Sequence, residues 1–119
     1  MVDHDEDDRE VFLEVVSELS PAAISSTAIN GADGLAKLAS LDTLPHVIFL
    51  DLNMPIMNGI EFLRQVKGMD HLKNIPIVIF STSGDDWAVR QVRDLGATEF
   101  ITKPSRVNEW RTAIGPFVL

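Results

Sequence analysis

Asp51 stands where a carboxylate can take part in chemistry. It follows the apolar run 47–50, which predicts a buried strand, and it precedes a Leu-Asn-Met-Pro turn at 52–55. Parallel α/β sheets bind their ligands beyond the carboxyl ends of their strands. An Asp at this point serves either a reaction or the cap of the next helix, and the residue alone does not decide between the two.

Polar side chains also follow two later apolar runs. Ser81 comes directly after residues 77–80, and Lys103 comes after the short run that contains Phe100. The carboxyl ends of parallel strands meet at one edge of a sheet, so we expect Asp51, Ser81 and Lys103 to lie together there. A group of acids near the N-terminus, around Asp3, is expected at the same edge.

A carboxylate, a hydroxyl and an ammonium at one edge suit the transfer of a phosphoryl group onto Asp51. Such a group carries negative charge over three oxygens, and its transfer is catalysed mostly by positioning and charge neutralisation. Asp51 would attack as the nucleophile, Lys103 would neutralise one oxygen and Ser81 would donate a hydrogen bond to another. The acids near Asp3 would repel the group, so a divalent cation must lie between them. Mg²⁺ suits this place because it binds a few protein oxygens together with phosphate and water.

The elements that must position these residues alternate between strands and helices. Short apolar runs predict strands and apolar residues at helical spacing predict helices. The predicted strands are residues 1–2, 23–29, 46–50, 75–80 and 100–101. The predicted helices are residues 7–19, 35–41, 60–68, 85–95 and 107–114. This alternation predicts an α/β fold with a parallel sheet and helices on both of its faces.

Length and composition limit the function further. The 119 residues predict one domain over residues 1–119, and 45% apolar residues are typical of a globular protein. The absence of cysteine excludes disulfides and a thiolate metal site, and a net charge of −8 argues against direct nucleic-acid binding. No leader and no apolar stretch of membrane-spanning length is present, so we expect a cytoplasmic protein without a membrane span.

The site motifs, taken in order, resemble those of one known family. Asp51-Leu-Asn-Met-Pro-Ile-Met-Asn-Gly59, Ser81-Thr82 and Lys103-Pro104 stand at its usual spacings. The chain resembles a response-regulator receiver domain of the chemotaxis-regulator type, from bacterial two-component signalling, over essentially all of its length. The resemblance implies a flavodoxin-like, doubly wound sheet of five parallel strands in the order 2-1-3-4-5.

The same resemblance implies a role for each residue of the motifs. Asp51 would be the phospho-acceptor, and the backbone carbonyl of Asn53 would bind Mg²⁺ together with the acids. Ser81 would be the hydroxyl that turns toward the phosphoryl group, and Lys103 would pair with that group. Phe100 falls on the aromatic switch position, with ordinary core packing as the alternative. A cis bond is implied before Pro104.

The implied function is a phospho-switch rather than a turnover enzyme. A sensor histidine kinase or a phosphotransfer protein would supply the phosphoryl group, and the altered conformation would regulate a downstream protein. The chain would catalyse only its own phosphorylation and dephosphorylation. The resemblance names neither the kinase nor the target, and it leaves open whether the chain forms a homodimer.

The N-terminus departs from the family pattern in two ways. The predicted first strand is only Met1-Val2, which suggests a truncated strand or one that another chain completes. His4 stands where a metal-binding carboxylate is usual, and imidazole suits transition metals better than Mg²⁺. We therefore expect weak Mg²⁺ binding through Asp3, Asp51 and Asn53, with Mn²⁺ as another candidate. Asp5 could act as a substitute ligand, or His4 could simply face solvent.

Two other functions fit parts of the sequence. A degenerate receiver that binds its partner without phosphorylation is the main alternative, because of His4 and the short first strand. A phosphohydrolase of the haloacid-dehalogenase type needs a second Asp two residues after the nucleophile, as acid and base. Asn53 stands there and cannot transfer a proton, which argues against that class.

Overall fold

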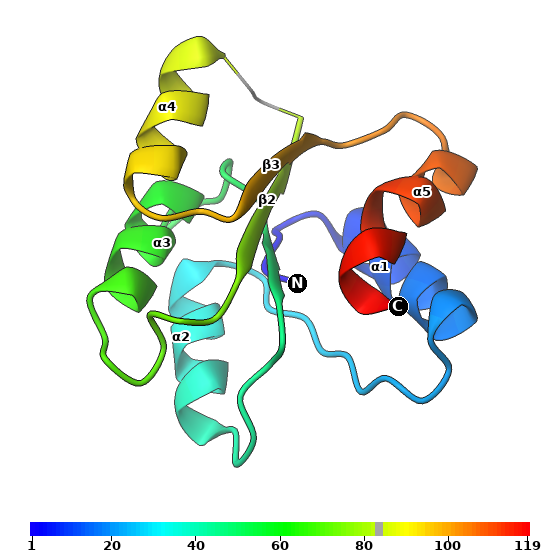
Figure 1. Ribbon diagram of the computed structural model, residues 1–119, viewed down its shortest axis with the longest axis horizontal. Helices are drawn as coiled ribbons and strands as arrows, with labels where there is room; N and C mark the ends of the chain where they lie inside the picture. Colours follow the sequence, from blue (N-terminus) through cyan, green and yellow to red (C-terminus); the bar gives the residue numbers. More distant parts are fainter. Residues whose placement is uncertain (83–84) are drawn as a thin grey trace.

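A three-stranded parallel sheet lies between two layers of helices (Figure 1). The computed structural model describes residues 1–82 and 85–119. The strands pair in the order β1 (Ile48–Leu50), β2 (Ile77–Ser81) and β3 (Glu99–Thr102). Two helices cover one face of the sheet, α1 (Glu6–Leu19) and α5 (Val107–Val118). Three helices cover the other face, α2 (Gly31–Ser40), α3 (Gly59–Lys67) and α4 (Asp86–Asp94).

Two further segments extend the sheet beyond β1 by single bridges. Val2 bridges Leu50 of β1 on one side and Ala28 on the other, both in parallel. The spatial order is therefore Ala28, Val2, β1, β2, β3, which is the predicted order 2-1-3-4-5. The predicted flavodoxin-like fold is confirmed, with its first two strands shortened to one bridging residue each.

The strand predicted over residues 23–29 is wrong except at Ala28. In this range, strand-type backbone hydrogen bonds form only at Ala28, which lies beside residues 1–3. Ala28 N–H donates to the Met1 carbonyl at 2.8 Å, and Asp3 N–H donates to the Ala28 carbonyl at 2.9 Å. Residues 23–27 form no strand, and Ile24 is fully exposed. A strand needs a neighbour along its length, and the short Met1–Asp3 segment provides too few backbone groups.

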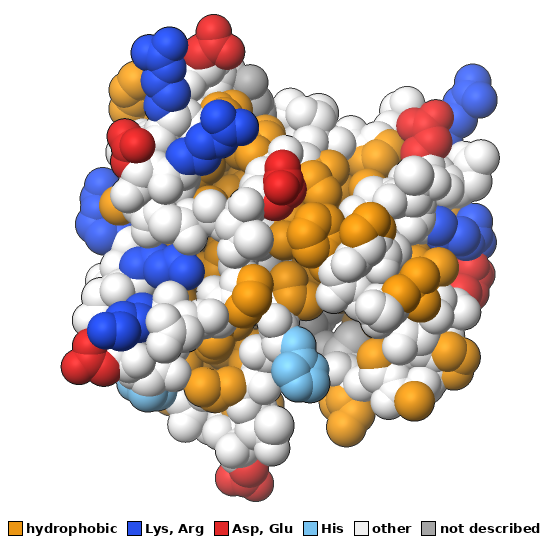
Figure 2. All heavy atoms as spheres, in the orientation of Figure 1, with side chains coloured by type: hydrophobic (Ala, Val, Ile, Leu, Met, Phe, Trp, Pro, Cys, Tyr) orange, Lys and Arg blue, Asp and Glu red, His pale blue; other side chains and the backbone are white. Residues whose placement is uncertain are grey.

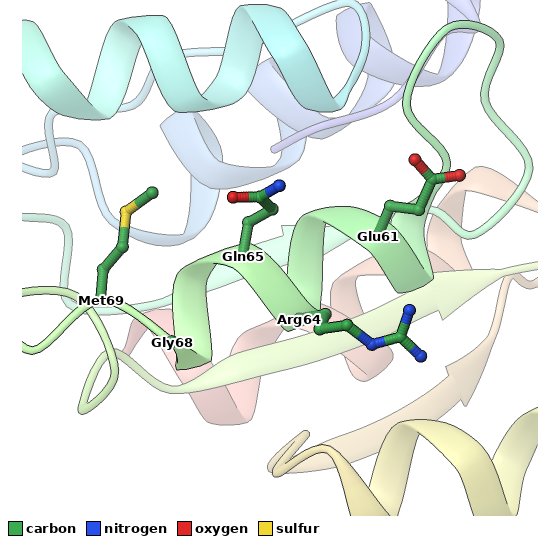
Figure 3. Close-up of a pocket in the computed structure, with 5 residues that line it drawn as sticks. All are labelled: Glu61, Arg64, Gln65, Gly68 and Met69. Carbon is green, nitrogen blue, oxygen red and sulfur yellow. The ribbon is translucent and has the colours of Figure 1, made fainter.

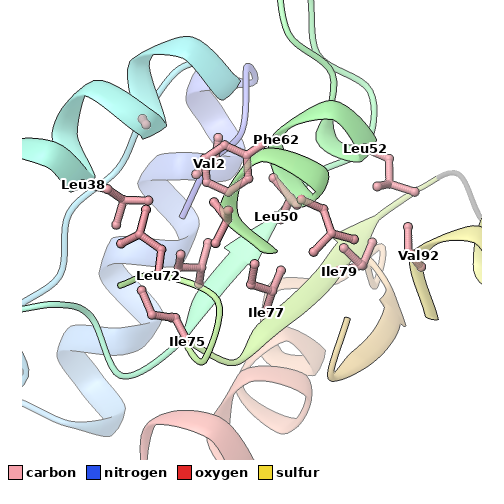
Figure 4. Packing of buried hydrophobic residues seen from close by; sticks show 14 of the residues in the cluster. Val2, Leu38, Leu50, Leu52, Phe62, Leu72, Ile75, Ile77, Ile79 and Val92 are labelled. Atoms are coloured by element: carbon pink, nitrogen blue, oxygen red, sulfur yellow. The ribbon is translucent and has the colours of Figure 1, made fainter. Parts of the chain in front are cut away.

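The apolar strands divide the core into two clusters, one on each face. Successive side chains of a strand point to opposite faces. Ile77 and Ile79 of β2 therefore join the cluster under α2, α3 and α4, which Figure 4 shows. Val78 and Phe80 join the cluster under α1 and α5. All of β2 is buried, as expected for a continuous apolar run inside a parallel sheet.

Side-chain caps fix where four helices begin. Each cap carboxylate or amide accepts a backbone N–H from the first turn of its helix. The caps are Asp5 for α1, Asn30 for α2, Asn58 for α3 and Asp85 for α4. The predicted helices agree with the observed ones to within a few residues. The largest differences are at α2, which begins at Gly31 rather than 35, and at α5, which continues past residue 114 to Val118. No helix among the described residues has the length and apolar character needed to cross a bilayer.

Gly59 is required at the start of α3 because the backbone around Asp51 lies against it. Its N–H donates to the Leu52 carbonyl at 3.1 Å. A Cβ at this position would collide with the Asp51 carbonyl oxygen and approach Leu52 Cα to 2.7 Å. The position of α3 therefore depends on the loop that carries Asp51.

We expect Gly59→Ala to lower the free energy of unfolding by about 1–3 kcal/mol, because backbone atoms must move to admit the methyl group. Gly68→Ala is the matched control, since its Cβ would meet nothing closer than the Arg64 carbonyl oxygen at 3.4 Å. That control should change the free energy by less than about 1 kcal/mol. Urea denaturation of both variants measures the difference, and equal losses would contradict the close approach.

Candidate functional site

The carboxylate of Asp51 meets the hydroxyl of Ser81 at the carboxyl ends of two paired strands. Asp51 follows β1 directly, and its N–H donates to the Val2 carbonyl at 3.0 Å. Ser81 is the last residue of β2 and is fully buried. Its Oγ donates a hydrogen bond of 2.7 Å to Asp51 Oδ1. The Asp51 side chain is only 4% exposed, so this contact is nearly dry.

Lys103 brings a positive charge to the same edge from the end of β3. Its N–H donates to the Ser81 carbonyl at 3.0 Å, which ties the chain after β3 to the end of β2. Its Nζ lies 3.9 Å from Asp51 Oδ2. The same Nζ donates to Asp3 Oδ2 at 2.6 Å and to Asp8 Oδ2 at 2.8 Å. The structure thus gathers Asp51, Ser81, Lys103 and Asp3 as the sequence predicted.

Burial and ion pairing together set the charges of this cluster. Burial of the ammonium works against its charge, but the hydrogen bonds that it donates to Asp3 and Asp8 outweigh burial and raise the pKa of Lys103. Burial raises the pKa of Asp3, and the hydrogen bond from Lys103 offsets part of that rise. Lys103 is therefore charged throughout the neutral range.

His4 lies beside the two buried carboxylates. Its Nδ1 is 3.5 Å from Asp51 Oδ2, and its side chain is 48% exposed. One ligand atom from each of Asp3, His4 and Asp51 lies within 4.8 Å of the others, which is close enough for one metal ion. The donor set is two carboxylates and an imidazole, so it fits a divalent cation that accepts nitrogen as well as oxygen.

Asp5, considered as a substitute metal ligand, has a different role. Its carboxylate caps α1 by accepting the Asp8 N–H at 3.1 Å. Its own N–H donates to Asp3 Oδ1 at 2.9 Å. Recruiting Asp5 to a metal would therefore remove the cap of α1.

The remaining predicted residues surround the cluster. Asn53 is exposed in the loop after β1, and Phe100 is half-buried in β3 against the cluster under α2, α3 and α4. The predicted cis bond before Pro104 is wrong, since the described chain contains no cis peptide bond. Trans is the more stable isomer by about 0.5–1 kcal/mol. In this form the Pro104 carbonyl accepts the Trp110 Nε1–H at 3.0 Å.

Asp8 is the site residue that sequence reasoning missed. The predicted helix over residues 7–19 includes Asp8 in its first turn, where the helix dipole favours negative charge and no partner is needed to explain an acid. Glu6, Asp7 and Asp8 all occupy that turn, but among them only Asp8 contacts Lys103 in the described structure. A contact between residues 95 positions apart leaves no signal in local spacing.

Two pockets lie elsewhere on the molecule, and neither is lined by the residues of the candidate site. One, of about 360 Å³, is lined by Glu61, Arg64, Gln65, Gly68 and Met69 beside α3 (Figure 3). The other is an apolar groove of about 640 Å³ beside β1, and its lining includes Met1, Phe49 and Phe117. The candidate site is a polar cluster at the strand ends, apart from both of these pockets.

Comparison with known families finds one match over nearly the whole chain. The sequence profile described as "Response regulator receiver domain" matches residues 1–115. Among solved structures, the phosphorylated cyanobacterial phytochrome response regulator RcpA is similar with a TM-score of 0.89 and 26% identity, covering 97% of this chain and 86% of that one. Chemotaxis protein CheY4 of Vibrio cholerae is similar with a TM-score of 0.82 and 25% identity, covering 98% and 93%.

The chain spans only part of the length of the curated relatives that it matches. A protein-glutamate methylesterase/protein-glutamine glutaminase of Treponema denticola is 42% identical over 99 residues, which are 82% of this chain and 26% of that protein. Protein PilG of Pseudomonas aeruginosa is 34% identical over 88 residues, covering 74% and 64%. The chain thus spans about a quarter of the methylesterase relative.

We expect Lys103→Met to lower the free energy of unfolding by about 3 kcal/mol at pH 7, because it leaves Asp3 buried without its cation. Burial raises the folded-state pKa of Asp3 above its unfolded value, so the folded state takes up a proton first as the pH falls. The loss should therefore shrink between pH 7 and pH 5. Urea denaturation at both values measures this.

The matched control is Lys73→Met. Lys73 pairs with Asp70 at 3.4 Å, and both side chains are well exposed. Exposed pairs contribute little to stability, so this variant should unfold like the wild type at both pH values. Equal losses in the two variants, or a Lys103→Met loss that does not change with pH, would contradict the buried pairing.

Proposed function

The chain belongs to the response regulator receiver domain family of two-component signalling, and we propose that it accepts a phosphoryl group on Asp51. Receiver domains are phospho-acceptor signalling modules that take phosphoryl groups from histidine kinases. The single observation that carries the assignment of Asp51 is its environment. A hydroxyl donor contacts one carboxylate oxygen, and a charged ammonium faces the other.

The two oxygens of Asp51 have different roles in this proposal. Oδ1 accepts the Ser81 hydroxyl at 2.7 Å, whereas Oδ2 lies 3.9 Å from Lys103 Nζ and 3.5 Å from His4 Nδ1. Oδ2 is therefore the nucleophile. Its bond to phosphorus forms as the bond from phosphorus to the kinase's histidine nitrogen breaks, and that imidazole leaves.

Ser81 and Lys103 stabilise the phosphoryl oxygens in this transfer. Lys103 neutralises one oxygen by charge, and the Ser81 hydroxyl donates its hydrogen bond to another once it leaves Asp51 Oδ1. Water later attacks phosphorus, the bond from Asp51 Oδ2 to phosphorus breaks, and inorganic phosphate leaves with the carboxylate restored. The chain is thus a substrate that assists its own modification rather than a turnover enzyme.

A divalent cation would be held by Asp3 and Asp51, with the Asn53 carbonyl and the His4 imidazole beside them. Receiver domains bind Mg²⁺ at an acidic pocket, and the carboxylates of Asp3 and Asp51 are hard oxygen donors of the kind Mg²⁺ requires. When bound, the cation neutralises charge on the phosphoryl oxygens. Compared with a site that has oxygen ligands alone, the imidazole would weaken the binding of Mg²⁺. It would also shift the preference of the site toward Mn²⁺.

Phosphorylation would be transmitted to the surface by a movement of Ser81 and a change in the packing of Phe100. Both residues lie on neighbouring strands, and Ile79 of β2 pairs with Phe100 of β3. Beyond them, Trp87 of α4 is 67% exposed and Val107 of α5 is 47% exposed. Apolar side chains gather along the middle of the face in Figure 2, between the two helix layers. An apolar surface of this kind suits a downstream protein partner in the cytoplasm.

No observation favours a degenerate receiver that works without phosphorylation. Such a domain has no need for a hydroxyl and an ammonium at the same carboxylate, yet Ser81 and Lys103 both lie at Asp51. The short first strand and His4 suggest a degenerate receiver. Neither feature moves Asp51 away from the Ser81 hydroxyl or the Lys103 ammonium.

Incubation with acetyl phosphate and saturating Mg²⁺ should add one phosphoryl group, detected by intact mass. Asp51→Asn should abolish the addition, and Ser81→Ala should slow it by about tenfold or more through loss of one hydrogen-bond donor. Asp70→Asn, which removes an exposed acid away from the site, serves as the control and should behave like the wild type. Undiminished addition in Asp51→Asn would refute the assignment.

His4→Asp should tighten Mg²⁺ binding by about tenfold, because a hard carboxylate oxygen replaces an imidazole beside Asp51. The same change should improve Mn²⁺ binding less, so the preference for Mn²⁺ should fall. Trp110 is a suitable fluorescent reporter, since its Nε1 donates to the carbonyl of the residue after Lys103. His46→Asp is the control, and an unchanged Mg²⁺ affinity in His4→Asp would refute the role of His4.

A further inference from the structure

Asp8 is a second anchor for the ammonium of Lys103. An ammonium has three N–H donors, and two of them are used by Asp3 Oδ2 at 2.6 Å and Asp8 Oδ2 at 2.8 Å. The distance to Asp51 Oδ2, 3.9 Å, is too long for a hydrogen bond. Asp3 and Asp8 therefore hold the ammonium near the Asp51 carboxylate but beyond hydrogen-bond distance of it.

The two anchors differ in how easily they can release the ammonium. Asp3 is fully buried, and its other oxygen already accepts the Asp5 N–H at 2.9 Å. The Asp8 side chain is 27% exposed and lies in the first turn of α1. Water and the positive end of the helix can stabilise Asp8 after the ammonium leaves, but a buried carboxylate has no such substitute. Breaking the hydrogen bond from Lys103 to Asp8 therefore costs less free energy than breaking the one to Asp3.

Phosphorylation of Asp51 would change the competition for Lys103. A phosphoryl group carries about −1.5 to −2 charges near neutral pH, whereas a carboxylate carries one. Bonded to Asp51 Oδ2, it would extend from an atom that is already 3.9 Å from Lys103 Nζ. A short movement of a flexible lysine side chain would then exchange Asp8 for a more highly charged partner.

We propose that Asp8 is a positioning residue that competes with the phosphoryl group on Asp51 for Lys103 and thereby slows phosphorylation. This inference rests on the proposed function of Asp51. In the resting state Asp8 and Asp3 share the ammonium. As the bond from Asp51 Oδ2 to phosphorus forms and the donor's bond breaks, the ammonium leaves Asp8 for the phosphoryl oxygens. Asp8 does not touch the reacting atoms and acts only through Lys103.

The test compares rates of phosphorylation by acetyl phosphate at saturating Mg²⁺, followed by intact mass. Asp8→Asn removes the competing charge and should raise the rate by roughly threefold to tenfold. Asp7→Asn is the matched control, because it removes the same charge from the same helical turn at an exposed residue that does not contact Lys103. Its rate should stay close to that of the wild type. Asp8→Glu keeps the carboxylate and should also stay close to the wild type.

The direction of the change separates this proposal from a structural role of Asp8. A variant that only loosened the fold would be phosphorylated more slowly. A rate for Asp8→Asn that is unchanged, reduced or equal to that of Asp7→Asn overturns the inference, as does an equally fast Asp8→Glu. In those cases the wild type still takes up a phosphoryl group, and the proposed function stands. A wild type that takes up none overturns both.

Discussion

The buried ammonium of Lys103 is the interaction on which the arrangement of the site depends. Its side chain is 6% exposed, so its charge must be balanced by nearby carboxylates. Asp3, Asp8 and Asp51 supply that balance from the N-terminal segment, α1 and the end of β1. One cation thus holds together elements that are remote in the sequence. Each carboxylate of the cluster has Lys103 as a cationic neighbour. This charge balance allows the acidic cluster to accept a phosphoryl group, which carries more negative charge than a carboxylate.

The apolar layers supply the rigidity that this cluster needs. Phe49 of β1 and Phe80 of β2 pack edge to face with their centroids 6.1 Å apart, and Phe80 packs similarly on Trp110 at 4.9 Å. Asp51 and Ser81 each lie one or two residues beyond these rings. The hydrogen bond from Trp110 to the Pro104 carbonyl links the same core to the residue after Lys103. Core packing beneath the site therefore fixes the separation of the hydroxyl, the carboxylate and the ammonium.

The sequence predicted those parts of the structure that depend on local pattern. Apolar runs located β1, β2 and β3, and the polar residues that follow them located Asp51, Ser81 and Lys103 at one edge. The strand over residues 23–29 failed because pairing depends on a neighbour. Within that range, the backbone bonds from Met1–Asp3 reach only Ala28 and the Ser26 carbonyl, which accepts the terminal amine. Asp8 was missed because its partner is remote in sequence. The cis bond before Pro104 is implied by the family resemblance alone and is wrong, since no local pattern in the sequence specifies the isomer.

The central claim is that Asp51, rather than another acid of the cluster, carries the phosphoryl group. Borohydride reduction of the acetyl phosphate-treated protein converts an aspartyl phosphate to homoserine, which peptide mass mapping then locates. We expect homoserine at position 51 alone, because Asp51 has one oxygen that accepts the Ser81 hydroxyl and another that faces Lys103. Homoserine at position 3 or 8, or none at any position, would contradict it.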